Sequence, residues 1–191
     1  EQLMLFETEG GRIDAHQVRR LSLPSPATYC VADDRTGQLY VVHEAVGVYR
    51  FDANPETDVA PVLIDANRIG HFAGEVGGVA LYDGGEGARW LIASDLAANR
   101  LLVYDRGNDD SFVGAVVVAG SDGSSVEEPG GLHATSAPLS AALPNGGLVL
   151  ANEGARRYEL VDFRAIARAL RIGVGTPGGI ALPDTPPFPA V

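Results

Sequence analysis

The sequence predicts an all-β fold of the β-propeller type, and three observations lead to this expectation. Apolar residues come in short runs bounded by glycine, proline, asparagine and aspartate, with little helical periodicity. The 24 glycines and 12 prolines indicate many turns. A unit of two strands joined by a turn, with a carboxylate closing the first strand, recurs along the chain, and such repeats are typical of propeller blades.

The repeat is clearest in three aligned segments, LYVVHE (39–44), WLIASD (90–95) and LVLANE (148–153). Each is followed by a second strand, respectively VYRFD, LLVYD and YELVD. The closing carboxylates Glu44, Asp95 and Glu153 recur after 51 and then 58 residues. This period is somewhat longer than that of common four-stranded blades, and longer loops account for the difference. The chain is therefore expected to form about three to three and a half four-stranded blades.

Strands and one helix follow from the local patterns. We expect strands at 3–7, 20–23, 30–32, 38–44, 47–52, 62–65, 78–82, 90–94, 101–105, 112–119, 132–135, 148–152 and 158–161. Residues 162–170 are the one segment with a helical pattern, with Asp162 as the N-cap. Six strand residues are expected to be buried: Trp90, Leu91, Ile92, Leu102, Val103 and Val149.

Composition excludes several classes of protein. The formal net charge of −11 argues against a nucleic-acid partner, because phosphate neutralisation needs a basic surface. No apolar run approaches the length of a membrane span, so we expect no membrane segment. The single cysteine, Cys30, cannot form an internal disulfide, and no Cys/His cluster has zinc-ligand spacing.

Common enzyme motifs are absent from the sequence. There is no Gly-x-Ser-x-Gly elbow, Walker loop or dinucleotide fingerprint. Each of these motifs places glycines around one strand-to-helix turn, whereas the glycines of this chain lie between strands. Common nucleophile-dependent and nucleotide-binding enzymes are therefore disfavoured.

The carboxylates Glu44, Asp95 and Glu153 have two interpretations. At equivalent strand ends of a propeller they would lie in one layer, and oxygen-rich sites of this kind suit calcium. The alternative is that they cap strands and meet solvent. Other acidic pairs are expected in turns and solvated loops, namely Asp33–Asp34, Asp109–Asp110 and Glu127–Glu128. His43, beside Glu44, is expected to be structural.

The residues also resemble a known family, the β-propeller phytases. Residues 30–55, CVADDRTGQLYVVHEAVGVYRFDANP, are similar to the family pattern ADDExGxLYIAEEDxAIWKFxAEP. Downstream, LID, HF, GVALY, LIAS and YDR continue the resemblance in order between residues 63 and 106. GLVLANEG (147–154) resembles GLFVAQDG, and ELVDFRAIA (159–167) resembles KLVPWERIA. The resemblance covers roughly residues 3–170.

The resemblance implies a six-bladed propeller of which this chain matches the second half. It also implies calcium-dependent hydrolysis of phosphate monoesters of inositol hexakisphosphate (phytate), in which bound calcium holds the substrate phosphates and activates water. An anionic site attracts an anionic substrate only after calcium has inverted its charge. By resemblance we also expect the protein to be secreted or periplasmic, with any export signal upstream of this sequence.

Site residues follow from the resemblance position by position. Glu44 matches the second Glu of AEED and Glu75 the Asp of DIEG, which implies a catalytic role for both. The resemblance implies calcium ligands at Glu44, Glu75, Asp122 and, depending on where a gap is placed, Glu128. The strand-end carboxylates Asp95 and Glu153 complete the expected ligand set. Three family carboxylates are replaced, by Gly77, Thr28 and, depending on where a gap is placed, Gly130. Such losses should weaken metal binding steeply.

The expected division of the chain indicates that some strand edges need a partner. Residues 1–172 form the expected propeller segment and 173–191 a Gly/Pro-rich tail or linker. Three blades leave strand edges open, so we expect the missing propeller half, an adjoining domain or self-association to cover them.

Three functional hypotheses follow. The chain is a phytase-like hydrolase acting on phytate or another phosphate monoester, a non-catalytic propeller module that assists an adjoining phytase domain, or, more distantly, an unrelated propeller hydrolase of the lactonase type.

Overall fold

The computed structural model describes residues 1–23, 26–43, 45–85, 87–120 and 122–176. In this part of the chain thirteen strands form four antiparallel sheets, with a single helix, α1 (Phe163–Leu170). The prediction of an all-β fold is confirmed. No helix among these residues is long and apolar enough to cross a bilayer.

The sheets are an N-terminal hairpin and three blades. The hairpin pairs β1 (Gln2–Glu7) with β2 (Ile13–Arg19). Blade 1 contains β3 (Ala27–Asp33), β4 (Gln38–His43), β5 (Gly47–Asp52) and β6 (Val62–Ala66). Blade 2 contains β7 (Val76–Asp83), β8 (Arg89–Asp95), β9 (Arg100–Asp105) and β10 (Ser111–Val116). Blade 3 contains β11 (Pro129–Thr135), β12 (Gly147–Asn152) and β13 (Arg157–Asp162).

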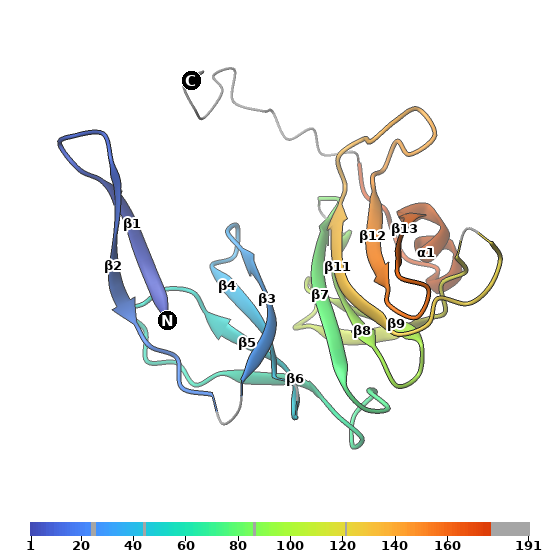
Figure 1. The fold of residues 1–191 in the computed structure, drawn as a ribbon, viewed down its shortest axis with the longest axis horizontal. Helices are drawn as coiled ribbons and strands as arrows, with labels where there is room; N and C mark the ends of the chain where they lie inside the picture. Colours follow the sequence, from blue (N-terminus) through green and yellow to red (C-terminus); the bar gives the residue numbers. More distant parts are fainter. Residues whose placement is uncertain (24–25, 44, 86, 121, 177–191) are drawn as a thin grey trace.

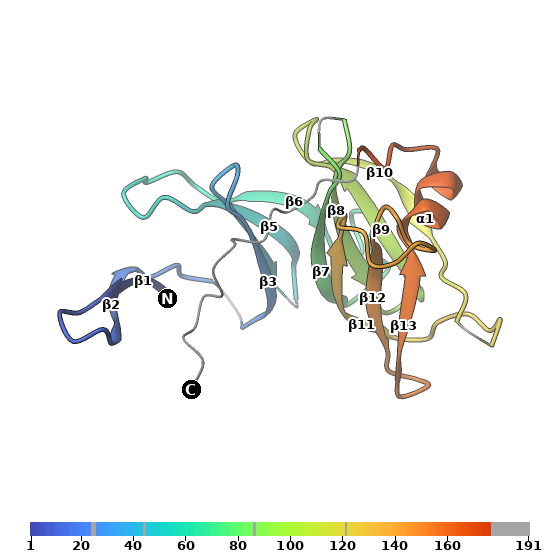
Figure 2. The same ribbon diagram turned by 90° about the horizontal axis from the view of Figure 1, so that it is seen from above.

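The blades stand side by side in an arc. Within each blade the strands follow one another in chain order, and the first strands β3, β7 and β11 are neighbours, with β7 in the middle. Figures 1 and 2 show this arrangement, with the β1–β2 hairpin set apart at one end. The prediction of about three to three and a half blades is therefore confirmed.

Blade 2 is buried on both of its faces. Along β8, Trp90 and Ile92 belong to the apolar core shared with blade 3, whereas Leu91 and Ala93 belong to the core shared with blade 1. Successive strand residues point to opposite faces, so a strand between two cores is apolar throughout. This position explains the uninterrupted WLIA run of the sequence.

The burial predictions hold for blade 2 and fail once in blade 3. Trp90, Leu91, Ile92, Leu102 and Val103 are at most 5% exposed. Val149 was expected to be buried but is 39% exposed. Its neighbours Leu148 and Leu150 point into the core, so Val149 lies on the blade face turned away from blade 2.

The N-terminal strands differ from the prediction. The expected strand at 20–23 is wrong: residues 20–23 form no strand, and β2 lies upstream at Ile13–Arg19. The sequence IDAHQVR is mostly polar, so the apolar-run criterion misses it. It becomes a strand because it pairs in register with β1.

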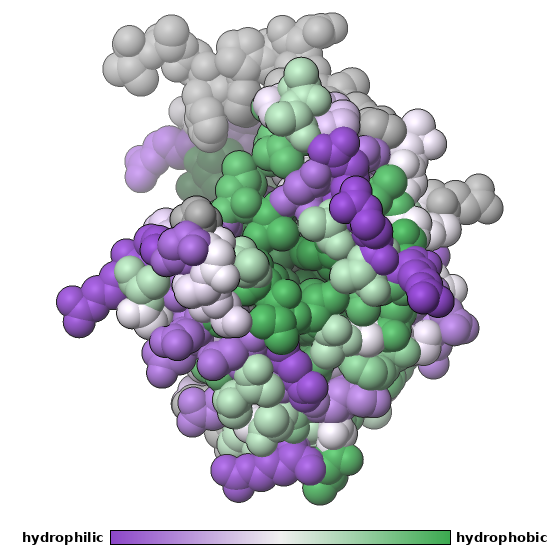
Figure 3. Space-filling model, turned by 90° about the vertical axis from the view of Figure 1, so that its right-hand side faces the viewer, coloured by the Kyte–Doolittle hydropathy of each residue, from purple (hydrophilic) through white to green (hydrophobic). Residues whose placement is uncertain are grey.

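The predicted helix is confirmed. Asp162 caps it, because its Oδ1 accepts a hydrogen bond of 2.9 Å from the backbone N–H of Arg164. Arg171 ends the helix in the left-handed conformation, at φ 58°. Phe163, Ile166 and Ala167 pack into the core between blades 2 and 3, where Phe163 stacks on Tyr82. Figure 3 shows apolar side chains gathered around a hollow on the side of the molecule that carries α1 and β13.

The packed part of the chain continues beyond α1. Trp90 Nε1 donates to the carbonyl of Gly173 at 2.9 Å, and Ile172 and Val174 pack against the core. The expected linker at 173–191 therefore begins with residues that are docked on blade 2. Residues 177–191 lie outside the described part of the chain.

A buried polar clamp joins blades 1 and 2. Arg50 forms an ion pair with Asp110, which also accepts a hydrogen bond of 3.1 Å from the Tyr40 hydroxyl. Burial and the Asp110 carboxylate raise the pKa of Tyr40. Asp110 was expected in a solvated loop but is 5% exposed, because the β9–β10 turn folds against blade 1. In a second contact between the blades, Arg106 forms an ion pair with Asp33. Asp33 also accepts a hydrogen bond from the backbone N–H of Arg35, which is the local bond expected for a turn at this position.

We predict that Asp110→Asn lowers the free energy of unfolding by about 1–3 kcal/mol, because it removes a buried charge that the half-buried Arg50 pairs with. Asp109→Asn is the matched control, since Asp109 also bonds Arg50 and also has positive φ, yet its side chain is 86% exposed. We expect the control to change stability by less than about 0.5 kcal/mol. Urea titration measures both, and equal effects of the two variants would contradict the clamp.

A second prediction concerns Tyr82, whose hydroxyl lies 2.8 Å from the Asn145 carbonyl and 3.0 Å from that of Val174. Burial raises the pKa of Tyr82 from 10.0 to about 12. The neutral phenol therefore stabilises the folded state fully below pH 10, and this contribution is lost as the pH rises towards 12. Tyr82→Phe should cost about 1 kcal/mol at neutral pH and reduce the alkaline loss of stability. Parallel stability curves from pH 8 to 12 would refute this.

Candidate functional site

The predicted site residues gather at one edge of the sheets. Asp95 at the end of β8 pairs with Val76 at the start of β7, and Asn152 at the end of β12 pairs with Pro129 at the start of β11. Glu75, Asp95, Glu128 and Glu153 lie at these strand ends, an edge we call the carboxylate face. Glu44 lies outside the described residues.

Asp95 is the most deeply buried of these carboxylates. It is 0% exposed, and its Oδ2 accepts from Arg100 Nε at 3.0 Å and from the backbone N–H of Ala73 at 3.1 Å. Its Oδ1 is buried and has no hydrogen-bond partner within the described part of the chain. Arg100 also donates to the carbonyl of His71 at 2.7 Å. One oxygen of Asp95 is thus engaged in a structural ion pair and the other is unused.

Glu75 lies beside Asp95 and faces solvent. Its backbone carbonyl accepts from the N–H of Leu96 at 3.1 Å, which fixes the loop before β7 against the turn after β8. Its side chain is exposed. The expected catalytic residue Glu75 is therefore accessible at the carboxylate face.

Glu128 and Glu153 belong to neighbouring backbone segments. The N–H of Glu153 donates to the carbonyl of Glu128 at 3.3 Å, and the N–H of Glu128 donates to Asn99 Oδ1 at 2.8 Å. Asn99 lies in the turn between β8 and β9, so this contact joins blades 2 and 3. Both glutamates are exposed. The structure thus brings these two expected ligands onto neighbouring segments at the ends of β11 and β12.

Asp122, another expected ligand, lies in a turn where both of its oxygens have partners. Its Oδ1 accepts from the Ser124 hydroxyl at 2.5 Å and from the Ser124 N–H at 2.9 Å, and its Oδ2 lies 2.9 Å from Arg157. The hydrogen bonds from Ser124 and the Arg157 guanidinium hold the pKa of Asp122 well below its usual range. Arg157 also bonds Glu159. Asp122 is thus part of a salt-bridged turn.

The described carboxylates do not assemble a calcium site on their own. Among residues 1–23, 26–43, 45–85, 87–120 and 122–176, no three His, Cys, Asp or Glu side chains are placed to hold a metal ion. Calcium takes about six to eight oxygen ligands. Asp95 and Asp122 each have one carboxylate oxygen in an ion pair with an arginine. The residues present here therefore do not fit a complete site.

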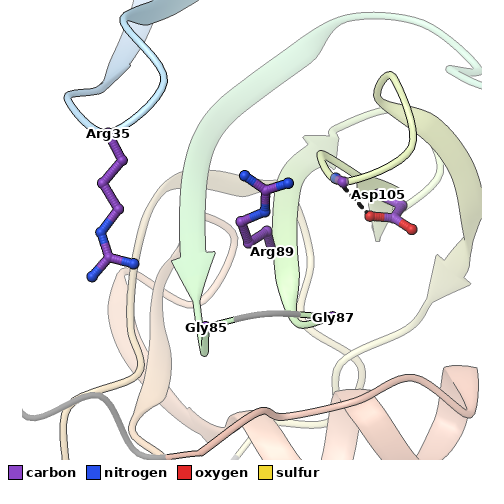
Figure 4. A pocket seen from close by; sticks show the side chains of 6 residues that line it. Arg35, Gly85, Gly87, Arg89 and Asp105 are labelled. Atoms are coloured by element: carbon purple, nitrogen blue, oxygen red, sulfur yellow. Dashed lines mark hydrogen bonds between the residues drawn. The ribbon is translucent and has the colours of Figure 1, made fainter.

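A polar pocket lies on the opposite edge of the sheets. It has a volume of about 480 Å³ and is lined by Arg35, Gly85, Gly87, Arg89, Asp105 and Gly107. Figure 4 shows Asp105 bonded to the N–H of Gly107, a contact of 2.8 Å. None of the expected site residues lines this pocket. Its mixture of charges matches neither the expected metal site nor a purely anionic surface.

Sequence reasoning missed one buried network. Asp65 accepts from the Tyr104 hydroxyl at 2.6 Å and bonds His71 Nδ1 at 2.9 Å, and the His71 ring stacks on Phe112 at 3.7 Å between ring centroids. Burial and Asp65 raise the pKa of Tyr104. The segments LID and HF of the family pattern hold Asp65 and His71, and this spacing is the one signal that links them.

Comparison with known proteins identifies the family. The phytase family model matches residues 1–165, which is most of the chain. This protein belongs to the phytase family. A 3-phytase of Bacillus subtilis (strain 168) is 26% identical over 113 residues. That alignment covers 59% of this chain and 30% of the relative, so the chain spans less than two thirds of the length of its curated relative.

Gly77 and Gly130, two of the positions expected to replace family carboxylates, leave little space for a side chain. A Cβ atom on Gly77 would lie 2.4 Å from Ser94 Oγ and 2.9 Å from the Pro129 carbonyl. A Cβ atom on Gly130 would lie 1.9 Å from Glu153 Oε1. Real Cβ atoms do not approach other atoms so closely. The third replacement, Thr28, lies on the exposed part of β3. The glycine at 77 is therefore coupled to the close packing of β7 against β11, whereas the close contact at Gly130 is with the side chain of Glu153.

We predict that Gly77→Ala destabilises the protein by about 1–3 kcal/mol, because the added methyl group forces β7 away from Ser94 and β11. Gly10→Ala serves as the control, because no atom lies within 4 Å of its added Cβ. Urea unfolding of both variants tests this. A Gly77→Ala variant as stable as the control would show that β7 and β11 can separate and that a family carboxylate fits at this position.

Proposed function

We propose that this chain forms part of a phytase-type propeller that hydrolyses phosphate monoesters of inositol hexakisphosphate in a calcium-dependent reaction. The observation that carries the proposal is the match of the phytase model to residues 1–165. The three blades and the carboxylate face are consistent with this family. The activity, substrate and metal of the complete protein are part of the proposal.

Charge supports the need for a cation. The chain has a formal net charge of −11, and the carboxylate face presents the exposed side chains of Glu75, Glu128 and Glu153. A substrate carrying several phosphates is repelled by such a surface unless a bound cation changes the sign of the local field. Calcium, a cation that prefers oxygen ligands, meets this requirement.

Glu75 is the described residue best placed for a catalytic role. It is exposed, it lies beside the buried Asp95, and the hydrogen bond from Leu96 to its carbonyl fixes its backbone. Glu44 is the other proposed catalytic residue. The incomplete ligand set predicts weak calcium affinity, of the kind found in extracellular modules. We therefore propose a secreted or periplasmic location, where calcium is abundant enough to fill such a site.

The second candidate function is a non-catalytic module that assists an adjoining phytase domain. It is favoured by a specific observation: Gly77 is held in close packing between Ser94 and β11, and Asp95 and Asp122 form ion pairs with arginines. A face in which carboxylates are lost or ion-paired is stable without a metal. Under this hypothesis the chain binds its partner domain and releases no phosphate itself.

The two functions are separated by phosphate release from phytate, measured with calcium and after chelation. We expect calcium-dependent release by the wild-type chain, and a loss of about 10²-fold in Glu75→Gln, because an essential carboxylate loses its charge. Glu56→Gln is the matched control, since Glu56 is exposed in the β5–β6 connection at the opposite edge.

Calcium titration calorimetry completes this experiment. Weaker calcium binding in the Glu44→Gln, Glu75→Gln double variant, with unchanged binding in Glu56→Gln, supports the assigned ligands. Phosphate release that survives chelation would contradict the calcium requirement. A folded chain that releases no phosphate under either condition would overturn the hydrolase and favour the assisting module.

A further inference from the structure

Three arginines of blades 1 and 2 lie at the edge of the sheets opposite the carboxylate face. Arg35 is in the turn between β3 and β4, Arg89 is the first residue of β8, and Arg106 directly follows β9. Arg35 and Arg89 line the pocket of about 480 Å³, together with glycines of the β7–β8 and β9–β10 turns. Figure 4 shows the side chain of Arg35 extending from the β3–β4 turn, with Arg89 on strand β8. We call these three residues the arginine cluster.

Strand pairing places Arg89 and Arg106 side by side. Trp90 of β8 pairs with Asp105 of β9, and one residue further the N–H of Arg106 donates to the carbonyl of Arg89 at 3.0 Å. Side chains that are opposite each other on neighbouring strands project from the same face of a sheet. Because Trp90 faces blade 3, Arg89 and Arg106 face blade 1, where Arg106 pairs with Asp33.

Two members of the arginine cluster have unused hydrogen-bond donors. The Arg106 side chain is 3% exposed, and its Nε and Nη1 atoms have no hydrogen-bond partner in the described part of the chain. Burial lowers the pKa of Arg106, because water no longer solvates its charge. The Arg89 guanidinium forms no ion pair or hydrogen bond with any of the described residues. Buried charged donors in folded proteins normally have acceptors, so this cluster has donors to offer to a ligand.

The carboxylates nearest to the arginine cluster already have partners. Asp33 forms its ion pair with Arg106, and Asp83 lies 3.2 Å from Arg35. Asp105 accepts a hydrogen bond of 2.8 Å from the backbone of the β9–β10 turn, and among the described residues no ion pair joins it to the cluster. An acceptor for the unused N–H groups must therefore come from outside the chain.

From these observations we infer that the arginine cluster binds a phosphate group. A guanidinium group matches phosphate oxygens with two parallel hydrogen bonds. The donors of two guanidinium groups serve more than the two oxygens of a carboxylate, whereas a phosphate group offers at least three. Three neighbouring arginines also supply the local positive charge that an anion needs in a chain with a net charge of −11.

The ligand is either free phosphate or the phosphate group of a small ester, since the pocket of about 480 Å³ admits both. The N–H groups that bind the phosphate group are the same in the two cases. The site lies at the edge opposite Glu75, so the inference does not depend on the proposed activity.

Titration calorimetry of the wild-type chain tests this site. Inorganic phosphate is the first probe, and methylphosphonate, which mimics an ester and cannot be hydrolysed, is the second. Both are titrated in the presence of EDTA, so that no calcium on the carboxylate face contributes, and at an ionic strength held constant with sodium chloride. We expect saturable binding with a Kd of about 1 mM or tighter. Tighter binding of one probe assigns the free ion or the ester as the ligand.

Arg89→Gln should raise this Kd at least about tenfold, because it removes charge-assisted hydrogen bonds to the phosphate oxygens. Arg12→Gln is the matched control, since it makes the same change of charge at an exposed residue of the β1–β2 turn. We expect the control to change the Kd by less than about twofold, because salt screens a distant charge. Far-ultraviolet circular dichroism shows that both variants remain folded.

Nuclear magnetic resonance gives an independent readout at the buried member of the cluster. The Nε–H signal of Arg106, assigned by its loss in Arg106→Lys, should shift on addition of phosphate and saturate with the Kd found by calorimetry. The absence of saturable binding of either probe would overturn the inference. Equal weakening in Arg89→Gln and Arg12→Gln, or an Arg106 signal that phosphate does not move, would overturn it as well.

Discussion

The close approach of the inner strands β7 and β11 is the constraint on which the rest of the structure depends. Their backbones come so near at Gly77 and Gly78 that a Cβ atom at either position would overlap the backbone of β11. Ser94 Oγ bridges them, lying within hydrogen-bond distance of the carbonyls of Gly78 and Gly130. This contact sets the separation of blades 2 and 3, and Trp90, Ile92, Leu148 and Phe163 fill the space between them.

The same constraint shapes the chemistry of the carboxylate face. Close packing leaves no room for a side chain at Gly77, and the carboxylates near this edge are bound in different ways. Asp95 pairs with Arg100 and Asp122 with Arg157, whereas Glu75, Glu128 and Glu153 stay exposed. Ion pairing with arginine lowers the electrostatic repulsion that a cluster of carboxylates otherwise creates. The face therefore combines a rigid, internally neutralised part with an exposed acidic part.

Local sequence patterns predicted the features that depend on one strand and its turns. The runs WLIAS and LLVYD predicted buried strands in blade 2, and Asp162 predicted the start of the helix. Each of these signals is contained in a few consecutive residues. Val149, Asp110 and the strand at Ile13–Arg19 were not predicted correctly, since each depends on a partner distant in the sequence. Val149 has no blade against its face, Asp110 meets Arg50 and Tyr40 of blade 1, and β2 is held by β1. The contacts of the expected site residues are likewise non-local: Asp122 pairs with Arg157, which is distant in the sequence.

The exposure of the inner strands depends on how many blades lie beside them. The middle strand β7 has a neighbour on each side and is buried along most of its length, whereas β3, with β7 on one side, is exposed along most of its length. The strands have similar positions in their blades, so the difference comes from neighbours and not from sequence pattern alone. Groups at the mouth of a propeller act in a low-dielectric environment only when blades surround them. The residues of blade 1 that face this region, including Thr28 and Tyr29, reach such an environment only when another protein surface lies opposite them. A protein surface that covered β3 and blade 3 would therefore also strengthen the electrostatic interactions at the carboxylate face.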